Sequence, residues 1–199
     1  MSSQPVTPPS GVAMPHRPLT VAEYLEIEVE SGYTELAEGR LELSPSGVWR
    51  HNRTCNRLWQ AFEAQLPPHL TTTTDIDVDL QLVPADAPGT VRRPDVVVVG
   101  RDAVQRVDRE GGVLRASEVV LAVEVVSPGS RRLDRRIKRD EYADAGIPHY
   151  WIVDLDEPVS LVACHLAGEF GYMDPGAVTG TFRTTEPFPV EIDLHALLD

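Results

Sequence analysis

Two acidic residues stand in or beside apolar segments, where a carboxylate is energetically costly. Glu124 lies within the run VVLAVEVV at residues 119–126, and Asp95 follows Pro94 and precedes the run VVVV. Continuous apolar runs of this length are typical of strands that are buried on both faces of a sheet. A carboxylate buried in such a strand needs a cation or hydrogen-bond donors as partners. We therefore take Asp95 and Glu124 as candidate functional residues.

Two carboxylates on neighbouring strands would supply hard oxygen ligands, which suit Mg²⁺ or Mn²⁺. Each acid also has a plain structural interpretation. Glu124 could form a buried salt bridge with an arginine of the basic segment that follows it, and the Pro-Asp pair could simply begin a turn. The positions of the two acids leave these alternatives open.

The chain has a single lysine, Lys138, among 18 basic residues. A chain so rich in arginine would be expected to use arginine wherever only positive charge mattered. The lysine ammonium is a compact charge that can position a water molecule or stabilise negative charge on a phosphate. The alternative interpretation is a helical ion pair between Asp134 and Lys138 at i,i+4 spacing.

Three arginines at four-residue spacing, Arg131, Arg135 and Arg139, predict a basic stripe on one face of a helix. Residues 92–139 contain 12 basic and 7 acidic residues, whereas the rest of the chain contains 6 and 24. The net charge of −13 argues against tight non-specific binding to nucleic acid. A local basic stripe beside a metal site nevertheless suits a polyanionic substrate such as DNA, whose phosphates the three arginines would bind. The alternative is a solvated helix face that happens to be basic.

The periodicity of apolar residues predicts an α/β fold with a mixed central β-sheet flanked by helices. Thr20 is the expected N-cap of the first helix, and Glu38-Gly39 is the expected hairpin turn. The last 40 residues predict two or three further strands and a short terminal helix. Helices are expected at 19–31, 46–66 and 130–145, a hairpin at 33–43, and strands at 74–83, 96–99, 119–126 and 149–154.

The predicted strand at 74–83 alternates strictly between apolar and polar residues, the pattern of a half-buried strand. Its acidic residues Asp75, Asp77 and Asp79 are interpreted as a solvent-exposed face rather than as a second metal site.

Composition is that of a globular protein, with 42% hydrophobic and 25% charged residues in 199. Residues 18–199 are expected to form a single domain. Residues 1–17 are rich in Pro and Ser and predict a disordered tail rather than a signal peptide. No apolar run approaches the length of a membrane span, so a cytoplasmic protein is expected.

The cysteines and histidines predict no zinc site. Cys55 and Cys164 form no CxxC pair and are interpreted as buried apolar thiols. The six histidines form neither an HExxH nor an HxH motif.

Taken together in this order, RPDVVVV, LAVEVVSPGSRRLDRRIK and YADAGIPHYWIVD resemble the Uma-two family of restriction endonucleases, within the PD-(D/E)XK nuclease superfamily. The stretch YTELAEGRLELSPSGVWRH is similar to the hairpin of that family and to the histidine that follows it. The resemblance covers residues 33–154. It implies a restriction-endonuclease-like fold and a metal-dependent endonuclease that hydrolyses phosphodiester bonds of DNA.

The resemblance assigns the two acids to Asp95 and Glu124, with a divalent metal, Mg²⁺ or Mn²⁺, between them. In the usual nuclease signature a lysine stands two residues after the second acid, but that position is Val126 here. Similarity to members whose lysine has moved to the following helix gives the role to Lys138. Glu35 and His51 match positions that the family often keeps near its site.

Two other functions remain open. The chain could be a nuclease-fold module without activity that binds DNA or protein, or a phosphodiesterase that acts on RNA or a small nucleotide. A homodimer is expected only by analogy with enzymes of this fold, because cutting two strands needs two sites. The apolar segment 159–162, Phe182 and Phe188 could form its interface or belong to the core.

Overall fold

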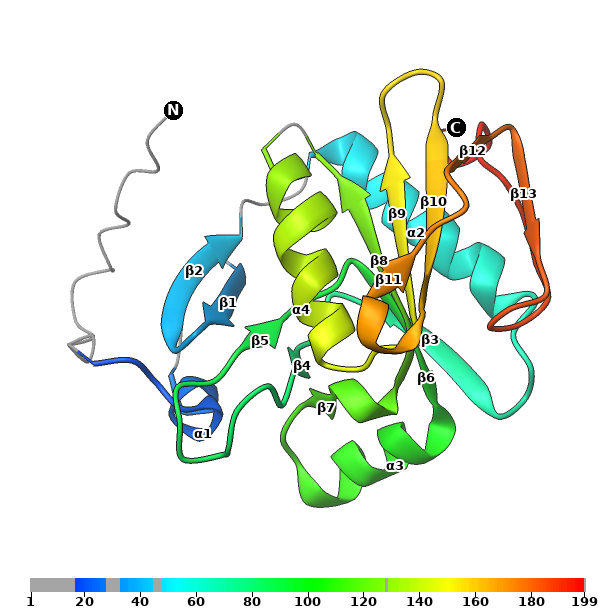
Figure 1. Ribbon diagram of the computed structural model, residues 1–199. Helices are drawn as coiled ribbons and strands as arrows, with labels where there is room; N and C mark the ends of the chain where they lie inside the picture. The colour runs from blue at the N-terminus through cyan, green and yellow to red at the C-terminus, as the bar shows by residue number, and fades with distance from the viewer. Residues whose placement is uncertain (1–16, 28–32, 45–47, 128, 199) are drawn as a thin grey trace.

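The apolar run that contains Glu124 forms β8 (Val119–Val126), an inner strand of a seven-stranded sheet in the computed structural model (Figure 1). The structure describes residues 17–27, 33–44, 48–127 and 129–198. β8 pairs antiparallel with β6 (Val96–Gly100) and parallel with β9 (His149–Asp154), so the sheet is mixed, as predicted. Both faces of these inner strands are covered, which explains their unbroken apolar sequences.

The complete strand order of this sheet is β11-β10-β9-β8-β6-β3, and β12 pairs with β10. Their bounds are β3 (Leu70–Thr74), β10 (Ser160–Leu166), β11 (Tyr172–Met173) and β12 (Ala177–Thr179). A separate hairpin consists of β13 (Thr181–Thr184) and β14 (Val190–Asp193).

One face of the large sheet packs against α2 (Trp49–Glu63) and the β13–β14 hairpin. Phe62 of α2 lies edge-on to Trp151 of β9 and to Phe188, with ring centroids 5.9 and 5.7 Å apart. Phe182 and Phe188 are therefore core residues of this chain, and so is Leu161 of the predicted segment 159–162.

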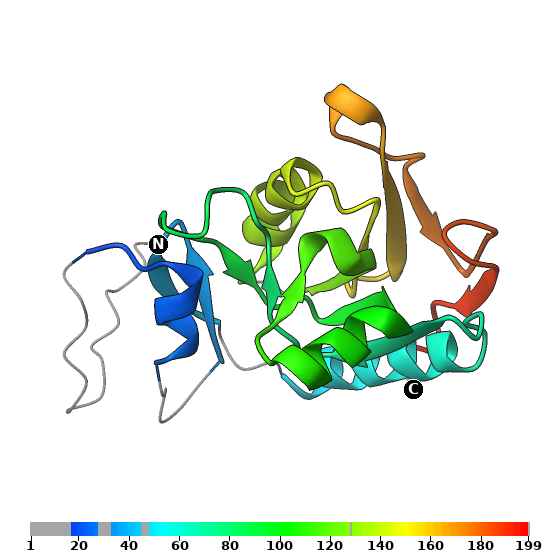
Figure 2. The same cartoon turned by 90° about the horizontal axis from the view of Figure 1, so that it is seen from below.

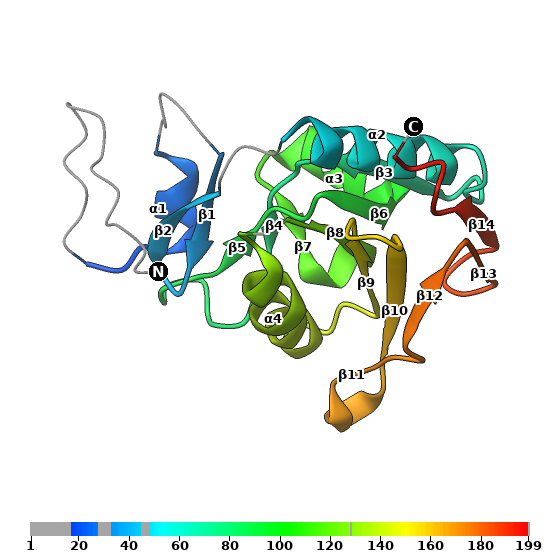
Figure 3. The same cartoon turned by 90° about the horizontal axis from the view of Figure 1, so that it is seen from above.

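The opposite face packs against α3 (Arg101–Glu110) and α4 (Lys138–Asp144). Tyr142 of α4 lies edge-on to Tyr150 of β9, with ring centroids 5.1 Å apart. Figure 3 shows α2 and α4 on opposite sides of the sheet. Side chains that meet at one end of the sheet can therefore come from both helices.

The predicted helix at 130–145 is present, but its first part is not regular α-helix. Residues Leu133–Ile137 form a π-helical segment, η2, directly before α4. The backbone N–H of Lys138 donates to the carbonyl oxygen of Leu133, five residues earlier. π-Helical turns are rare and often mark functional positions.

A smaller sheet has the order β2-β1-β5-β4-β7 and lies beside the larger one (Figures 1 and 2). Its predicted hairpin is confirmed, with Glu38 and Gly39 at positive φ in the turn. Thr20 caps α1 (Val21–Leu25) in a reciprocal capping box with Glu23. The strands are β1 (Tyr33–Ala37), β2 (Arg40–Ser44), β4 (Val78–Asp79), β5 (Val91–Arg92) and β7 (Leu114–Arg115).

Two secondary-structure predictions were wrong, and some elements were not predicted at all. The expected strand at 74–83 is broken, because Asp75 and Gln81 adopt positive φ and only β4 remains of it. The last 40 residues contain five short strands, and turns follow Asp193 in place of the predicted terminal helix. The helix α3 and the short 3₁₀ turns η1 (Ala116–Glu118) and η3 (Gly168–Phe170) were not predicted.

Other predictions fall partly outside the described residues. The first helix ends at Leu25, and residues 28–31 of its predicted span are not described. Residues 1–16 of the predicted tail also lie outside the description, and a single domain over 18–199 stays a prediction. In the described part of the chain, no helix has both the length and the apolar character needed to cross a bilayer.

Candidate active site

Asp95 and Glu124 are brought together by the pairing of β6 with β8. Val96 pairs with Val123 in the antiparallel register, so the next step along each strand places Asp95 opposite Glu124. Asp95 Oδ2 accepts a hydrogen bond from the backbone N–H of Val125, 2.7 Å away. That bond fixes the first acid at the end of β6, beside the strand that contains the second.

Lys138 lies between two buried acids. Its ammonium donates to Oε1 of Glu124 at 2.8 Å and forms an ion pair with Oε1 of Glu35 at 3.0 Å. The hydroxyl of Tyr142 also donates to Glu124 Oε1, at 2.9 Å. Glu124, Lys138 and Glu35 are each less than 5% exposed. The structure therefore joins β8, α4 and β1 through one buried ammonium group.

Arg92 holds Glu35 from the other side. Its guanidinium donates to Glu35 at 3.0 Å, to Glu42 at 3.2 Å and to both oxygens of Glu141 at 2.7 Å. The backbone N–H of Arg93 donates to the remaining oxygen of Glu35 at 2.9 Å. This buried arginine thus ties the hairpin to α4 and fixes the orientation of the acid that Lys138 contacts.

The charges of the site oppose one another. Burial raises the pKa of Glu124 well above its usual range; Lys138 opposes the shift, while Asp95 and Asp134 add to it. Burial also raises the pKa of Asp134 to about 6, against the opposing charge of Lys138. For Glu35 the same burial is outweighed by Lys138 and Arg92, so its pKa is lowered.

A divalent cation fits this arrangement. Three acids (Glu35, Glu124 and Asp134) act on the Lys138 ammonium, and the charges of Asp95 and Glu35 add to the raised pKa of both Glu124 and Asp134. Among the described residues, hydrogen bonds reach only Oδ2 of Asp95 and only Oε1 of Glu124. One oxygen of each carboxylate therefore remains for a cation, whose charge would relieve the excess of negative charge.

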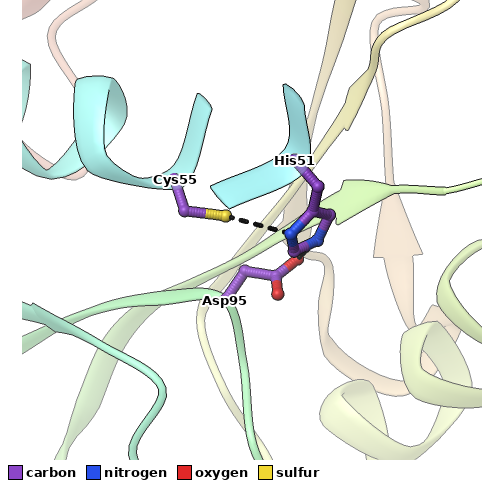
Figure 4. A group of neighbouring side chains, drawn as sticks. All are labelled: His51, Cys55 and Asp95. Atoms are coloured by element: carbon purple, nitrogen blue, oxygen red, sulfur yellow. Dashed lines mark hydrogen bonds and ion pairs between the residues drawn. The ribbon is translucent and has the colours of Figure 1, made fainter. Parts of the chain in front are cut away.

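His51 reaches the same site from the first turn of α2. Its Nε2 lies 3.1 Å from Asp95 Oδ2, and its Nδ1 lies 3.7 Å from the Sγ of Cys55 (Figure 4). Burial lowers the pKa of His51, but the hydrogen bond and charge of Asp95 raise it to about 9. At neutral pH the imidazolium is thus a partner of Asp95.

The predicted arginine stripe exists, but each member already has an aspartate partner. Arg131 contacts Asp156 at 2.6 Å, Arg135 contacts Asp154 at 2.6 Å, and Arg139 contacts Asp174 at 2.9 Å. Phosphate binding by these arginines therefore requires exchange of an aspartate for a phosphate.

The alternatives for the charged residues have mixed outcomes. Glu124 does form a buried salt bridge to the following helix, but its partner is Lys138 and not an arginine. The ion pairs of Lys138 among the described residues are with Glu35 and Glu124, in place of the alternative helical pair with Asp134. Asp134 itself is buried.

The acidic stripe is only partly the solvent face that was expected. Asp77 forms a half-buried ion pair with Arg93 at 2.7 Å, and Asp79 accepts from the backbone N–H of Gln81. Burial and the neighbouring charge of Asp95 raise the pKa of Asp75. Asp75 therefore borders the site.

Four residues of the site were missed in the sequence: Arg92, Asp134, Tyr142 and Cys55. Asp134, Lys138 and Tyr142 follow one another at four-residue spacing, which could have indicated a polar line facing the sheet. Nothing in the sequence marks Arg92 among 17 arginines or pairs Cys55 with Asp95.

Comparisons with known proteins agree with the fold. A family model described as "Uma2: Putative restriction endonuclease" matches residues 21–186. A solved structure from Anabaena variabilis ATCC 29413, described as a putative nuclease belonging to DUF820, is similar with a TM-score of 0.68 and 14% sequence identity. The similarity covers 91% of this chain and 98% of that one, so the restriction-endonuclease-like fold class is confirmed. No curated protein matches the chain.

Proposed function

Because this chain belongs to the Uma2 family, we propose that it is a Mg²⁺-dependent endonuclease that hydrolyses phosphodiester bonds of DNA. Asp95, Glu124 and Lys138 would be its catalytic residues. The observation that supports this proposal most is the meeting of two carboxylates from neighbouring strands with the chain's single lysine in one largely buried site.

Asp95 and Glu124 would hold the cation through the carboxylate oxygens that the hydrogen bonds leave open. Mg²⁺ prefers such oxygen ligands and keeps several waters, and Mn²⁺ accepts the same set. When bound, the cation would lower the pKa of a water and stabilise negative charge on the phosphate.

Lys138 would act as a positive hydrogen-bond donor and not as a base. The charges of Glu124 and Glu35 outweigh the effect of burial and raise the pKa of Lys138, so the ammonium stays protonated. Two of its three N–H groups point to Glu35 and Glu124. The third would orient the attacking water or donate to a phosphate oxygen.

Glu35 and His51 would position the reacting groups. Glu35 fixes the ammonium of Lys138 and is itself fixed by Arg92. His51 holds Asp95 Oδ2 and so leaves the other oxygen of Asp95 for the cation. Both residues would therefore tune geometry rather than contact the scissile bond.

The arginine stripe would bind the DNA backbone outside the site. Arg131, Arg135 and Arg139 would exchange their aspartate partners for phosphates. Because the chain has a net charge of −13, the affinity would be modest and strongly dependent on salt.

The decisive experiment is plasmid cleavage with Mg²⁺ by the wild type and by Glu124→Gln, which keeps the size of the side chain. We expect the variant to lose cleavage, and Glu169→Gln, at an exposed residue of η3, to retain it. Excess EDTA should stop the wild type. Equal cleavage by the wild type and Glu124→Gln would overturn the proposal.

A nuclease-fold module without activity is the second candidate, and the net charge of −13 favours it because unaided DNA affinity should be low. Calorimetry with Mn²⁺ together with the cleavage assay separates the two. A module with intact acids would bind the metal without cutting any nucleic acid. Supplying plasmid DNA, single-stranded RNA and cyclic dinucleotides in parallel would identify a phosphodiesterase with another substrate.

A further inference from the structure

A thiol, an imidazole and a carboxylate meet where the first turns of α2 face Asp95 (Figure 4). Cys55 follows His51 by four residues, so both side chains lie on the same face of the helix. One potential ligand atom from each of His51, Cys55 and Asp95 lies within 4.8 Å of the other two. We propose that these three residues bind a thiophilic divalent cation such as Zn²⁺, at a position distinct from the hard-cation position beside Glu124.

The ligand types select the cation. A thiolate and an imidazole favour Zn²⁺ and similar metals, whereas Mg²⁺ favours oxygen ligands. Glu124, whose carboxylate is bonded to Lys138 and Tyr142, is not part of the group. The thiol of Cys55 is therefore the feature that distinguishes this position from the proposed Mg²⁺ position.

The geometry requires only small movements. Zinc bonds of roughly 2.0 to 2.3 Å at tetrahedral angles separate the ligand atoms by about 3.3 to 3.8 Å. The present separations of up to 4.8 Å would contract by about 1 Å, with the imidazole turning one nitrogen towards the cation. The protons of the Cys55 thiol and of the His51 imidazolium would pass to solvent as the thiolate and the neutral imidazole bind the cation. Three protein ligands would leave the fourth position to water.

Asp95 belongs both to this group and to the proposed Mg²⁺ position beside Glu124. The effect of Zn²⁺ on cleavage described next therefore rests on the proposed function. A cation held by His51 and Cys55 would draw Asp95 away from the position opposite Glu124. Zn²⁺ would then inhibit Mg²⁺-dependent cleavage rather than support it. The competing interpretation of Cys55 is a plain core thiol, since it also contributes to the apolar cluster under α2.

The test uses Co²⁺ as a spectroscopic probe for the zinc position, on the full chain without a histidine tag. A cobalt–thiolate bond gives a near-ultraviolet charge-transfer band that oxygen ligands do not give. We expect the band in the wild type at one equivalent of Co²⁺, its loss in Cys55→Ser, and its displacement by Zn²⁺. Cys164→Ser is the matched control, because Cys164 is the other buried thiol and lies outside the group.

Two further variants keep the result clear. His51→Ala should weaken the band. This variant provides the test if Cys55→Ser does not fold, and circular dichroism measures the folding of both variants. Glu124→Gln should keep the band while losing cleavage, so this proposal and the proposed nuclease function can fail separately. Absence of the band in the wild type, or its persistence in Cys55→Ser, would overturn the inference.

Discussion

One helical segment, η2 followed by α4, has two sets of polar residues in opposite surroundings. Asp134, Lys138 and Tyr142 form an inward line: all three are buried, and Lys138 and Tyr142 bond directly to Glu124. The arginine stripe lies one position further along the same turns. Its side chains are 28 to 48% exposed, and each is paired with an aspartate.

The contrast separates charge that organises a site from charge that only covers a surface. An exposed ion pair contributes about 0–1 kcal/mol, since water solvates both partners in either state. Removal of one partner from a buried pair leaves an uncompensated charge and costs about 3–5 kcal/mol. The inward line and the arginine stripe have the same four-residue spacing, but the buried inward line is expected to contribute more to stability.

The largest expected difference is between Lys138→Met and Arg135→Met. The first leaves Glu35 and Glu124 without their shared ammonium and should lower the free energy of unfolding by about 3–5 kcal/mol. The second should lower it by less than about 1 kcal/mol. Urea denaturation at pH 7 measures both, and values within error of each other would remove the contrast.

Asp134→Asn should make the stability of the folded protein depend less on pH. Burial raises the pKa of Asp134 to about 6 from a model-compound value of 3.8, so the native state holds this proton more tightly than the unfolded chain. The stability from this group is therefore fully present below about pH 4 and is lost as pH rises through 6. As pH rises from 4 to 7, the free energy of unfolding of the variant should therefore increase by up to roughly 3 kcal/mol relative to that of the wild type.

Denaturation midpoints at pH 4, 5, 6 and 7 check this prediction. Asp154→Asn is the control beside the arginine stripe: hydrogen bonds and the charges of Arg131 and Arg135 outweigh burial and lower the pKa of Asp154 below its usual value of 3.8. Its contribution to stability is therefore fully present above about pH 4, and the difference between the wild type and Asp154→Asn should stay nearly constant from pH 4 to 7. A constant difference between the wild type and Asp134→Asn across that range would contradict the assignment.

Tyr142→Phe removes a buried hydrogen bond to Glu124 and should cost about 1 kcal/mol of stability. We also expect slower plasmid cleavage, because Glu124 loses one of its two fixed contacts. Tyr150→Phe is the matched control. Its hydroxyl donates to the backbone carbonyl of Asp134, so its loss should lower stability with little change in cleavage. Equal effects of both variants on cleavage would argue against a positioning role for Tyr142.

The smallest effect on folding is expected for Arg139→Ala, with a cost of less than about 1 kcal/mol. If the arginine stripe binds DNA, the slope of log affinity against log salt concentration should fall by about 1. Fluorescence anisotropy with a labelled duplex in Ca²⁺ measures that slope. An unchanged slope for Arg139→Ala, and likewise for Arg131→Ala, would mean that the stripe is only a solvated helix face.

The strands of the site could be predicted because burial dictates their sequences. The runs at 96–99, 119–126 and 149–154 form β6, β8 and β9, where both faces must be apolar. The alternation at 74–83 gave a wrong prediction, because Asp75 and Gln81 adopt positive φ, which a period-two pattern of apolar residues does not encode. α3 was missed because charged residues make up much of its short sequence.

Asp95, Glu124 and Lys138 could be proposed from residue type and neighbours alone. Their partners could not, because each contact joins segments far apart in the chain. Arg92 meets Glu141 only through the packing of β5 beside α4, and Cys55 meets Asp95 only through the placement of α2 at the start of β6. Pairing of this kind depends on register and helix position, which no local pattern records.

The π-helical segment before Lys138 makes this helix sensitive to its own length. A π-helical turn holds one residue more than an α-helical turn, so removal of one residue between Asp134 and Lys138 would leave the two at i,i+3 spacing on one face of a regular α-helix. A second deletion would take Asp134 off that face, because an α-helix advances 100° per residue. The segment should therefore tolerate the loss of one residue and lose the site with the loss of two.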